Sequence, residues 1–394
     1  MSNRKTAIIG VCGGIAAYKT ASLCSMLSKA GFDTHVLMTE NATEFITQTT
    51  FETLTSNKCI VDTFDRDFNF EVEHIALAKK ADVFLIAPAT ANIIAKIAHG
   101  IADNMLTTTF LASTCTKIVA PSMNTQMYNN PITENNIDIL KKYGIEVITP
   151  STGLLACKDI GIGKMPEPEV LYSYIEKAVT DKDFVNKNIL VTAGPTKEKI
   201  DPVRYISNHS TGKMGYAIAK AAANRGANVT LVSGTKALPE IPFVKTIYID
   251  TAEDMFNEVT GNSDNYDIII KAAAVADYRP ADVSFHKIKK SDNNLEIKLE
   301  RTCDILKYLG ENKADGQLLC GFSMETENLT ENSKKKLNSK NLDMIVANNL
   351  LEKGAGFAHD TNKVTIITKD KELQLELMSK SDVANAILDE LTGM

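Results

Sequence analysis

The sequence predicts an α/β protein with two doubly wound, Rossmann-like domains, and three observations support this prediction. The chain has 394 residues, a length typical of about two or three domains. Twice along the chain, a strand-like apolar run leads through a glycine-containing turn into a helical pattern. Each such opening is the start of a βαβ unit, and parallel sheets are built from these units. A polar stretch at 180–188 separates the two series, so we expect domains at 1–185 and 186–394.

The first series begins with a strand at 6–11, a turn that contains Gly13 and Gly14, a helix at 15–30 and a strand at 34–38. Apolar residues in the helical segment recur every three or four positions, which is the spacing of one helix face. The rest of this half alternates strands and helices in the same way. Further strands are expected at 83–87, 117–120 and 146–148, and further helices at 91–98, 132–143 and 169–179.

The second series begins with a strand at 188–192, a turn at 193–195, a long polar loop, a helix at 212–224 and a strand at 228–232. Further strands are expected near Ile247 and at 268–271, 318–320 and 344–346, followed by a hairpin of strands at 363–368 and 373–377. The last helix is expected at 382–391. Ser381 precedes it and is the expected N-cap, because a serine hydroxyl accepts a hydrogen bond from a free amide of the first turn.

The composition is that of an ordinary globular protein and narrows the range of partners. Hydrophobic residues make up 44% and charged residues 23%, and 43 Lys+Arg against 49 Asp+Glu give a net charge of -6. Nucleic-acid binders usually carry a basic excess, so we expect no nucleic-acid partner. The seven cysteines are scattered and include no Cys-x-x-Cys pair, so no protein metal site is expected and a reducing cytoplasm is favoured. No apolar run approaches the roughly 20 residues of a membrane helix, and no signal-peptide pattern opens the chain, so we expect a cytoplasmic protein without a membrane partner.

Glycine and polar residues follow several strands of the first half, where α/β sheets bind ligands. Gly13 and Gly14 expose backbone amides at a helix N-terminus, which is a ready site for an anion, although many such turns bind no nucleotide. The motif APATAN at 87–92 opens another helix, so Thr90 and Asn92 are also plain helix caps by residue type. Cys157 lies in a glycine-rich loop between two elements, a layout typical of a mobile flap.

Four segments of this half are similar to one family: His74, APATAN at 87–92, PSMNTQM at 121–127, and LAC at 155–157 with GIGKM at 161–165. They resemble the flavin-containing cysteine decarboxylases. The full chain resembles the bacterial bifunctional phosphopantothenoylcysteine decarboxylases/phosphopantothenate–cysteine ligases of coenzyme A biosynthesis. The resemblance implies an FMN site in the first half, with cofactor contacts at Gly13, Gly14, Thr39, Thr90, Asn92 and Thr108.

The resemblance also implies a chemistry and three roles. A cysteinyl carboxylate loses CO2 poorly, because the carbanion left behind cannot spread its charge, and oxidation of the thiol by hydride transfer to flavin supplies the missing electron sink. His74 is then the base or thiol-orienting group, Asn124 binds the substrate carboxylate, and Cys157 donates a proton to the ene-thiolate. A homo-oligomer built on flavoprotein trimers is implied, with a dodecamer as a further option. In such a trimer FMN lies between subunits, and the histidine comes from a neighbour.

The second half carries polar segments of a different kind. Residues 204–215 form a polar loop before a helix, but they fail the Walker A pattern at Met214. Small residues at 272–276 permit close approach of a ligand. Basic runs at 287–290 and 334–336 share this half, and Lys340 lies one helical turn beyond Lys336 on the same face. A triphosphate needs this density of positive charge.

These segments resemble the ligase half of the same bifunctional family, with phosphopantothenate, cysteine and CTP as substrates and Mg2+ on the triphosphate. The phosphopantothenate carboxylate would attack the α-phosphorus of CTP, and the cysteine amine would then displace CMP from the acyl-cytidylate. Asn208, with Arg204 beside it, is tied to the acyl-cytidylate step, and Lys287 would neutralise phosphoryl charge. The implied CTP contacts are Ala273, Asp277, Lys287, Asp304, Ile305, Phe322, Lys336 and Lys340.

Some positions depart from the family pattern. Tyr128 stands where a tryptophan is frequent, and Gly14 stands where some members have serine. Residues 302–305 read Thr-Cys-Asp-Ile instead of Asn-Pro-Asp-Ile, which keeps Asp304 and Ile305 but leaves the base and ribose contacts of Thr302 and Cys303 open.

Two other functions compete with this interpretation. An NAD-dependent oxidoreductase would need a G-x-G-x-x-G fingerprint, which neither half contains. A non-enzymatic flavin-binding regulatory module would not need His74 or Cys157, and both are present.

Overall fold

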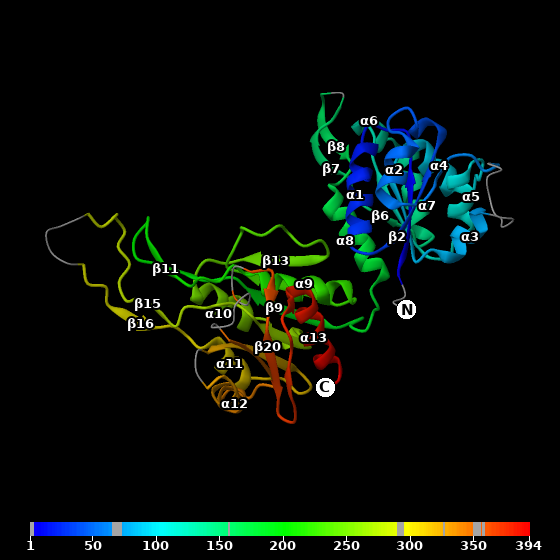
Figure 1. Cartoon of the computed structure of the whole chain (residues 1–394). Helices are drawn as coiled ribbons and strands as arrows, with labels where there is room; N and C mark the ends of the chain where they lie inside the picture. The colour runs from blue at the N-terminus through cyan, green and yellow to red at the C-terminus, as the bar shows by residue number, and fades with distance from the viewer. Residues whose placement is uncertain are drawn as a thin grey trace. The chain divides into compact units, whose positions relative to one another are not determined.

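The computed structural model of the chain (Figure 1) describes residues 4–64, 73–156, 158–289, 295–325, 328–349, 356 and 359–394. The chain divides into two compact units, Met1–Thr180 and Asp181–Met394. This division lies at the start of the polar stretch and a few residues before the expected boundary at 185/186. Each unit is a doubly wound α/β domain, as the sequence predicts. In the described part of the chain, no helix combines the length and apolar character needed to cross a membrane.

The first unit is built on a sheet of six parallel strands in the order β3-β2-β1-β4-β5-β6. The strands at its centre are buried on both faces, which is why they read as continuous apolar runs instead of alternating patterns. The strands are β1 (Thr6–Val11), β2 (Asp33–Met38), β3 (Cys59–Ile60), β4 (Val83–Ala89), β5 (Thr116–Pro121) and β6 (Glu146–Val147).

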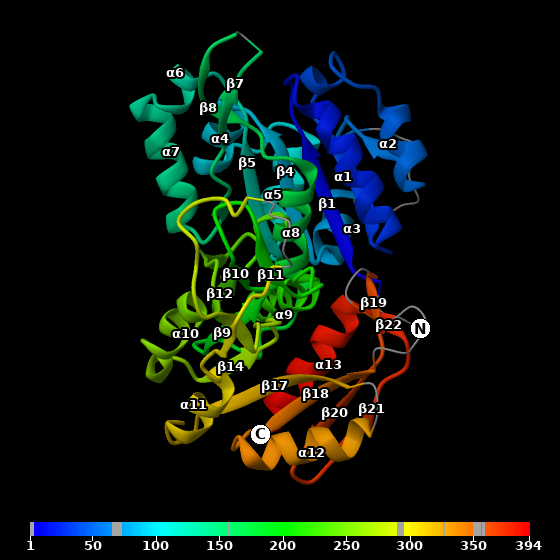
Figure 2. The same ribbon diagram turned by 90° about the vertical axis from the view of Figure 1, so that its left-hand side faces the viewer.

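Helices cover both faces of this sheet, and Figure 2 shows α1 and α7 on opposite sides of it. One face packs against α1 (Ala17–Lys29), α2 (Gln48–Thr55) and α8 (Pro168–Val179). The other packs against α3 (Glu73–Lys80), α4 (Ala91–Ala98), α5 (Met105–Ala112) and α7 (Pro131–Lys142). A 3-10 turn at Glu40–Ala42 and the short α6 (Thr125–Tyr128) complete the unit.

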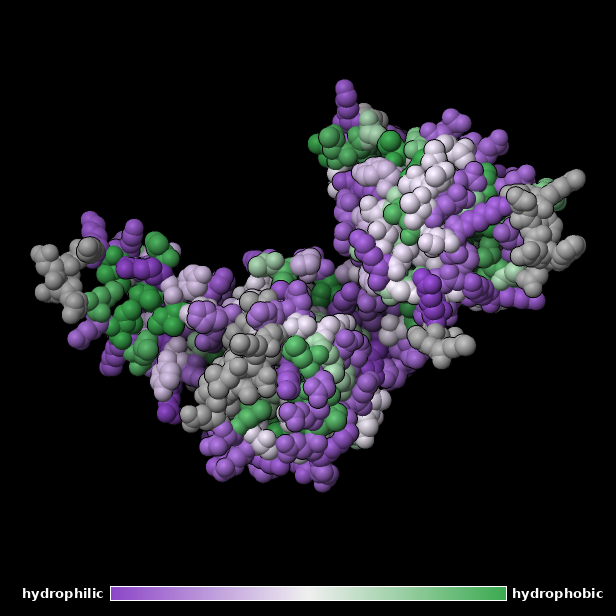
Figure 3. Space-filling model, viewed as in Figure 1, coloured by the Kyte–Doolittle hydropathy of each residue, from purple (hydrophilic) through white to green (hydrophobic). Residues whose placement is uncertain are grey.

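The glycine-rich segment around residue 157 is a hairpin, and not the loop that the sequence suggests. Strands β7 (Ser151–Leu154) and β8 (Ile160–Lys164) pair antiparallel, with Gly153 opposite Gly161. A Cβ on Gly161 would lie 2.3 Å from Oγ1 of Thr125, so this glycine permits close packing against α6. Figure 3 shows hydrophobic side chains at the hairpin, where Leu154 and Ile160 are exposed. Cys157 lies outside the described residues.

The second unit is built on an eight-stranded sheet in the order β13-β12-β9-β14-β17-β18-β20-β21. The first six strands run parallel, and β20 and β21 continue the sheet antiparallel. The strands are β9 (Asn188–Ala193), β12 (Asn228–Ser233), β13 (Val244–Tyr248), β14 (Ile268–Lys271), β17 (Leu318–Glu325), β18 (Met344–Asn349), β20 (Val364–Thr368) and β21 (Glu372–Gln374).

Helices also cover both faces of the second sheet. One face packs against α9 (Lys213–Asn224) and α13 (Lys380–Thr392), and the other against α10 (Ala252–Thr260), α11 (Ile305–Glu311) and α12 (Leu329–Ser339). The predicted N-cap of the last helix is wrong. Helix α13 begins at Lys380, and the hydroxyl of Ser379 accepts a hydrogen bond from the Asp382 amide at 3.1 Å. Ser381 lies inside the first turn, because the helix starts two residues earlier than its apolar pattern.

Short antiparallel pairs extend from the second sheet. They are β10 (Lys197–Lys199) with β11 (Tyr205–Ser207), β15 (Tyr278–Pro280) with β16 (Leu299–Arg301), and β19 (Thr361–Asn362) with β22 (Met378–Ser379); a 3-10 turn lies at Ser263–Asn265. The first pair interrupts the connection from β9 to α9. The long polar loop predicted there therefore contains a small hairpin.

Candidate active sites

The first cavity lies where the strand order of the first sheet reverses, between β1 and β4. Connections from these two strands lead to opposite sides of the sheet, and the resulting crevice at their carboxyl ends is the usual ligand site of an open α/β sheet. The cavity has a volume of about 500 Å3. Four of the sequence-predicted site residues line it: Gly13, Gly14, Thr90 and Asn124.

The two glycines of the turn after β1 have different roles. Gly13 permits close packing of the backbone, and Gly14 leaves space free in the cavity. A Cβ on Gly13 would lie 2.7 to 2.8 Å from Asn41 Cβ and the Asn41 backbone oxygen, so no side chain fits there. A Cβ on Gly14 would meet only Cγ of Pro88, at 3.9 Å. Gly14 thus faces open space inside the cavity, and the backbone amides of this turn are accessible to an anion.

Thr90 and Asn124 are both helix caps and cavity residues. The Thr90 hydroxyl accepts a hydrogen bond from the Ile93 amide at 3.3 Å, which confirms the capping interpretation for this residue. The Asn124 side chain accepts from the Gln126 amide at 2.8 Å at the start of α6. Because each cap fixes a side-chain orientation, both polar groups are held at the rim of the cavity.

Four other predicted residues of the first half do not line this cavity. His74 is half-buried in α3, Thr39 precedes the 3-10 turn, Asn92 is exposed on α4, and Thr108 lies in α5. Cys157 is outside the described residues, but 154–156 of the hairpin line the cavity. A single chain therefore brings together the glycine turn, one cap threonine and the asparagine, and leaves the histidine elsewhere.

Sequence reasoning missed a buried lysine beside this cavity. Lys19 is 6% exposed, and its ammonium donates to Glu167 at 2.8 Å and to the Met165 backbone oxygen at 3.3 Å. The Lys19 hydrogen bond lowers the pKa of Glu167. This ion pair joins α1 to the segment between β8 and α8. The sequence feature that could have indicated this buried lysine is its position among the apolar residues of an amphipathic helix.

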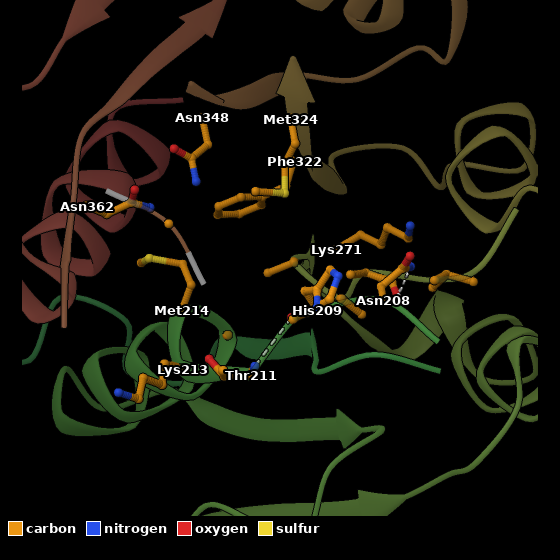
Figure 4. Close-up of a pocket in the computed structure, with 18 of the residues that line it drawn as sticks. Asn208, His209, Thr211, Lys213, Met214, Lys271, Phe322, Met324, Asn348 and Asn362 are labelled. Carbon is orange, nitrogen blue, oxygen red and sulfur yellow. Dashed lines mark hydrogen bonds between the residues drawn. The ribbon is translucent and has the colours of Figure 1, made fainter. Parts of the chain in front are cut away.

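The second cavity lies at the matching position of the second sheet, outside the carboxyl ends of β9 and β14 (Figure 4). Its volume is about 400 Å3. Four sequence-predicted residues line it: Asn208, Ala273, Asp277 and Phe322. The residues that the sequence reasoning missed include Lys271, His209, Thr211, Lys213, Asn348, Asn362 and Lys380.

Asn208 is held by the loop that follows β14. Its Nδ2 donates to the Ala274 backbone oxygen at 2.9 Å, and the Ala274 amide donates to the Gly194 oxygen at 3.0 Å. A Cβ on Gly215 would lie 2.7 Å from the Thr192 oxygen, so α9 packs directly on the end of β9. These contacts bring the β9–α9 connection and the loop after β14 together at one wall of the cavity.

Arg204 and Lys287 lie on two neighbouring segments, and neither lines the cavity. Arg204 forms an ion pair with buried Asp201 and donates to the Ile288 oxygen at 2.9 Å. Arg204 therefore anchors the segment that carries Lys287, whose own side chain is exposed.

Asp304 and Lys340 form an ion pair at 2.8 Å, and Asp304 also caps α11 through the Lys307 amide. Burial by itself raises the pKa of Asp304, but the Lys340 contact lowers it overall. The side chain of Ile305 is only 2% exposed and belongs to the core, so any ligand contact of this residue would use its backbone. Lys336 is half-buried on α12, one helical turn before Lys340.

Among the described residues, one buried polar atom of the second cavity has no hydrogen-bond partner. Oδ1 of Asn348, on β18, makes no hydrogen bond in the part of the chain that the structure describes. An unsatisfied buried amide is costly, and it indicates a position at which a ligand or water is expected to bind. Its sequence signal was weak, because Asn348 lies near the end of a strand whose apolar residues are typical of the core.

Comparisons with known proteins match each of the two units to a family. Residues 184–394 match the family described as DNA/pantothenate metabolism flavoprotein C-terminal domain, and residues 1–180 match the family described as Flavoprotein. The coenzyme A biosynthesis bifunctional protein CoaBC of Bacillus subtilis (strain 168) is 45% identical over 399 residues, which cover 100% of this chain and 98% of the relative. The CoaBC protein of Escherichia coli (strain K12) is 41% identical over 394 residues, covering 98% and 96%. The crystal structure of the C-terminal domain of a CoaBC protein is 48% identical and covers 54% of this chain and 98% of that chain, with a TM-score of 0.47.

The two domains and their matches define an α/β flavoprotein of pantothenate metabolism. The chain belongs to the family of coenzyme A biosynthesis bifunctional proteins CoaBC, because identity above 40% extends over nearly its full length. This confirms the family that the motifs indicated and disfavours an NAD-dependent oxidoreductase.

Proposed function

We propose that this chain joins phosphopantothenate to cysteine with CTP and then decarboxylates phosphopantothenoylcysteine to phosphopantetheine with FMN. Full-length similarity to CoaBC proteins supports the pairing of the two activities. The observation that carries the proposal is a separate cavity at the carboxyl edge of each sheet, lined in each half by residues that the family motifs single out.

The residues of the first cavity fit a flat cofactor that ends in a phosphate. The glycine turn offers backbone amides to the phosphate, and Ile15 and Tyr18 line the cavity with large exposed side chains, at 62% and 61%, beside which an aromatic ring would pack. Bound FMN would supply the electron sink that decarboxylation requires. Asn124 would bind the substrate carboxylate, because its cap bond fixes the direction of its amide.

Two further residues complete the proposed decarboxylase. The position of His74 on α3, away from the cavity of its own chain, supports a contribution from a neighbouring subunit in a trimer. Cys157 would donate a proton to the ene-thiolate, which is supported by the three residues that precede it in the sequence, 154–156, because they line the cavity. At neutral pH an ordinary thiol is protonated and able to donate.

The second cavity supports acyl activation. The substrate carboxylate would attack the α-phosphorus of CTP and release pyrophosphate, and the cysteine amine would then attack the acyl carbon and release CMP. Asn208 lies beside the small residues at 272–276, where the acyl group can approach the backbone. Lys287, Lys336 and Lys340 would neutralise the phosphates, with Mg2+ bound to the triphosphate.

We also propose a homo-oligomer. Trimers of the first half would assemble into a dodecamer only through a second interface between chains. The second half has an exposed apolar surface around β15 and β16 (Figure 3). Its large exposed side chains are Tyr278, Val283, Phe285, Leu295, Ile297 and Leu299. Such a patch is typical of a protein–protein interface.

The test is an assay of the purified chain with phosphopantothenate, cysteine, CTP, Mg2+ and FMN, followed by mass spectrometry. Phosphopantetheine is expected, and omission of FMN from apoprotein should leave phosphopantothenoylcysteine. Replacement of CTP by ATP tests the choice of nucleotide. A colourless protein that binds no flavin would contradict the first activity, and CTP that stays intact with both other substrates present would contradict the second.

A further inference from the structure

Lys271 is a charged residue at the end of a buried strand. Side chains on β14 alternate between the two faces of the sheet: Ile270 joins the core under α9 and α13, and Ile269 joins the core under α10, α11 and α12. Lys271 follows on the face of Ile269, at the carboxyl end of the strand. Its side chain therefore lies on the sheet face that α10, α11 and α12 cover, and it lines the second cavity (Figure 4).

The charged groups that act on Lys271 come from three neighbouring segments. Asp277 lies in the loop after β14, Asp304 caps α11, and Lys336 and Lys340 lie at the end of α12. Asp304 already forms an ion pair with Lys340. The backbone of Lys271 belongs to the sheet, whereas the Lys271 ammonium makes no hydrogen bond or ion pair with the described residues. His209 also lines the cavity.

This group of charges has a positive excess. The ammonium groups of Lys271, Lys336 and Lys340 are set against two carboxylates, of which one is paired. A net positive charge near a cavity concentrates anions, so the arrangement favours an anion with several charges. Lys271 lines the cavity, and its charge adds to those of Lys336 and Lys340 on α12, which suits a nucleotide triphosphate better than a single carboxylate.

We propose that the Lys271 ammonium is a further contact for the nucleotide phosphates in the ligase reaction, where it reinforces Lys336 and Lys340. This assignment rests on the proposed CTP-dependent activity of the second cavity. The shared chemistry is a phosphate group, which phosphopantothenate also carries. A role as the base that deprotonates cysteine is a different function, and the test separates it.

The electrostatics predict a specific signature. Burial, together with the nearby Lys340, lowers the pKa of Lys271 to about 8 in the free protein. A bound triphosphate stabilises the charged form and raises this pKa, so binding takes up a proton when the pH lies above about 8. CTP affinity is therefore highest at lower pH and falls as the pH rises through the free value, by about tenfold up to pH ~9.5. CTP phosphates are fully ionised throughout this range.

The experiment measures CTP binding to the full chain by isothermal titration calorimetry, between pH 7.5 and 9.5 and in buffers of different ionisation enthalpy. Lys271→Met is expected to raise the dissociation constant of CTP about tenfold at pH 7.5 and to abolish proton uptake. Lys271→Arg should retain most of the affinity and lose the pH dependence, because arginine stays charged. Lys245→Met is the matched control: it removes one exposed lysine of the same unit and should change neither quantity.

Several outcomes would overturn the assignment. If Lys271→Met bound CTP normally but bound phosphopantothenate more weakly, Lys271 would be a contact of the phosphopantothenate phosphate instead. A different outcome is normal CTP binding but slow amide formation in both Lys271 variants. If hydroxylamine, a nucleophile that needs no base, then restored the rate of acyl transfer, Lys271 would be a base. If the wild-type chain binds no CTP, the proposed ligase activity fails, whereas a variant-specific result concerns Lys271 alone. Circular dichroism of each variant excludes unfolding as the cause.

Discussion

The two halves begin with the same βα opening but connect it differently. In the first half, residues 12–16 lead directly from β1 into α1. In the second half, residues 194–212 include the β10–β11 pair before α9 begins. The short turn presents backbone amides of Gly13 and Gly14 to its cavity, whereas the long connection delivers the side chain of Asn208. One fold thus yields two kinds of site through the length of one loop.

The cavities also differ in the side chains that line them. Ile15, Tyr18 and Met127 give the first an apolar lining around its glycine turn. Lys271, Lys213 and Lys380 line the second, where Lys213 pairs with Asp360 at 2.7 Å. The first lining suits a flat ring with one phosphate, and the second suits a polyphosphate. Substitutions in one half should therefore leave the chemistry of the other half intact.

The largest effect is expected for Asn208→Asp. The new carboxylate cannot donate to the Ala274 oxygen and would repel both it and the phosphates. We expect amide formation to fall at least about hundredfold, while pyrophosphate release in a first turnover persists and the acyl-cytidylate accumulates. Mass spectrometry of quenched reactions detects that intermediate.

The comparison between halves supplies the control for this variant. Decarboxylation of added phosphopantothenoylcysteine should be unchanged in Asn208→Asp. A parallel loss of both activities would show that the two cavities are coupled, and it would contradict the expectation that each half works independently.

A smaller effect is expected for Gly13→Ala in the first half. Its methyl group would meet the Asn41 backbone at 2.8 Å, so β1, α1 or the 3-10 turn must shift. We expect a loss of about 1–3 kcal/mol of unfolding free energy and weaker flavin binding. Urea denaturation and flavin fluorescence measure the two quantities.

Gly14→Ala is the matched variant, because its methyl group would be 3.9 Å from the nearest atom outside the turn. It should keep the wild-type urea midpoint. Equal destabilisation by both alanines would contradict the packing role assigned to Gly13.

The smallest effect concerns Thr90, which caps α4 and lines the cavity. Thr90→Ala should lose about 1 kcal/mol of unfolding free energy, and Thr90→Asn should restore most of it, because asparagine is an effective N-cap. Flavin affinity measured on the same two variants separates two roles of Thr90. If the affinity falls in both variants, the hydroxyl contacts the flavin. If Thr90→Asn restores the affinity, only the helix cap matters.

The sequence by itself determined the two βα openings, most strands of both sheets and the family of the chain. These features are local: a glycine turn, an apolar run and a helical period are visible within about ten residues. Asn208, Asp277 and Phe322 were implied by the family resemblance, and they line one cavity. The hairpin around residue 157 and the Ser379 cap were missed, since local composition there reads equally well as loop.

Only the tertiary structure decided which side chains share a site. Strand β14 reads Ile-Ile-Ile-Lys, and a uniformly apolar strand has no period that tells one face from the other. The direction of Lys271 therefore follows from packing against α11 and α12, and so does the burial of the Ile305 side chain. The association of Lys271 with Lys336 and Lys340, more than 60 residues away, depends on the order of parallel strands, which is set by long-range packing.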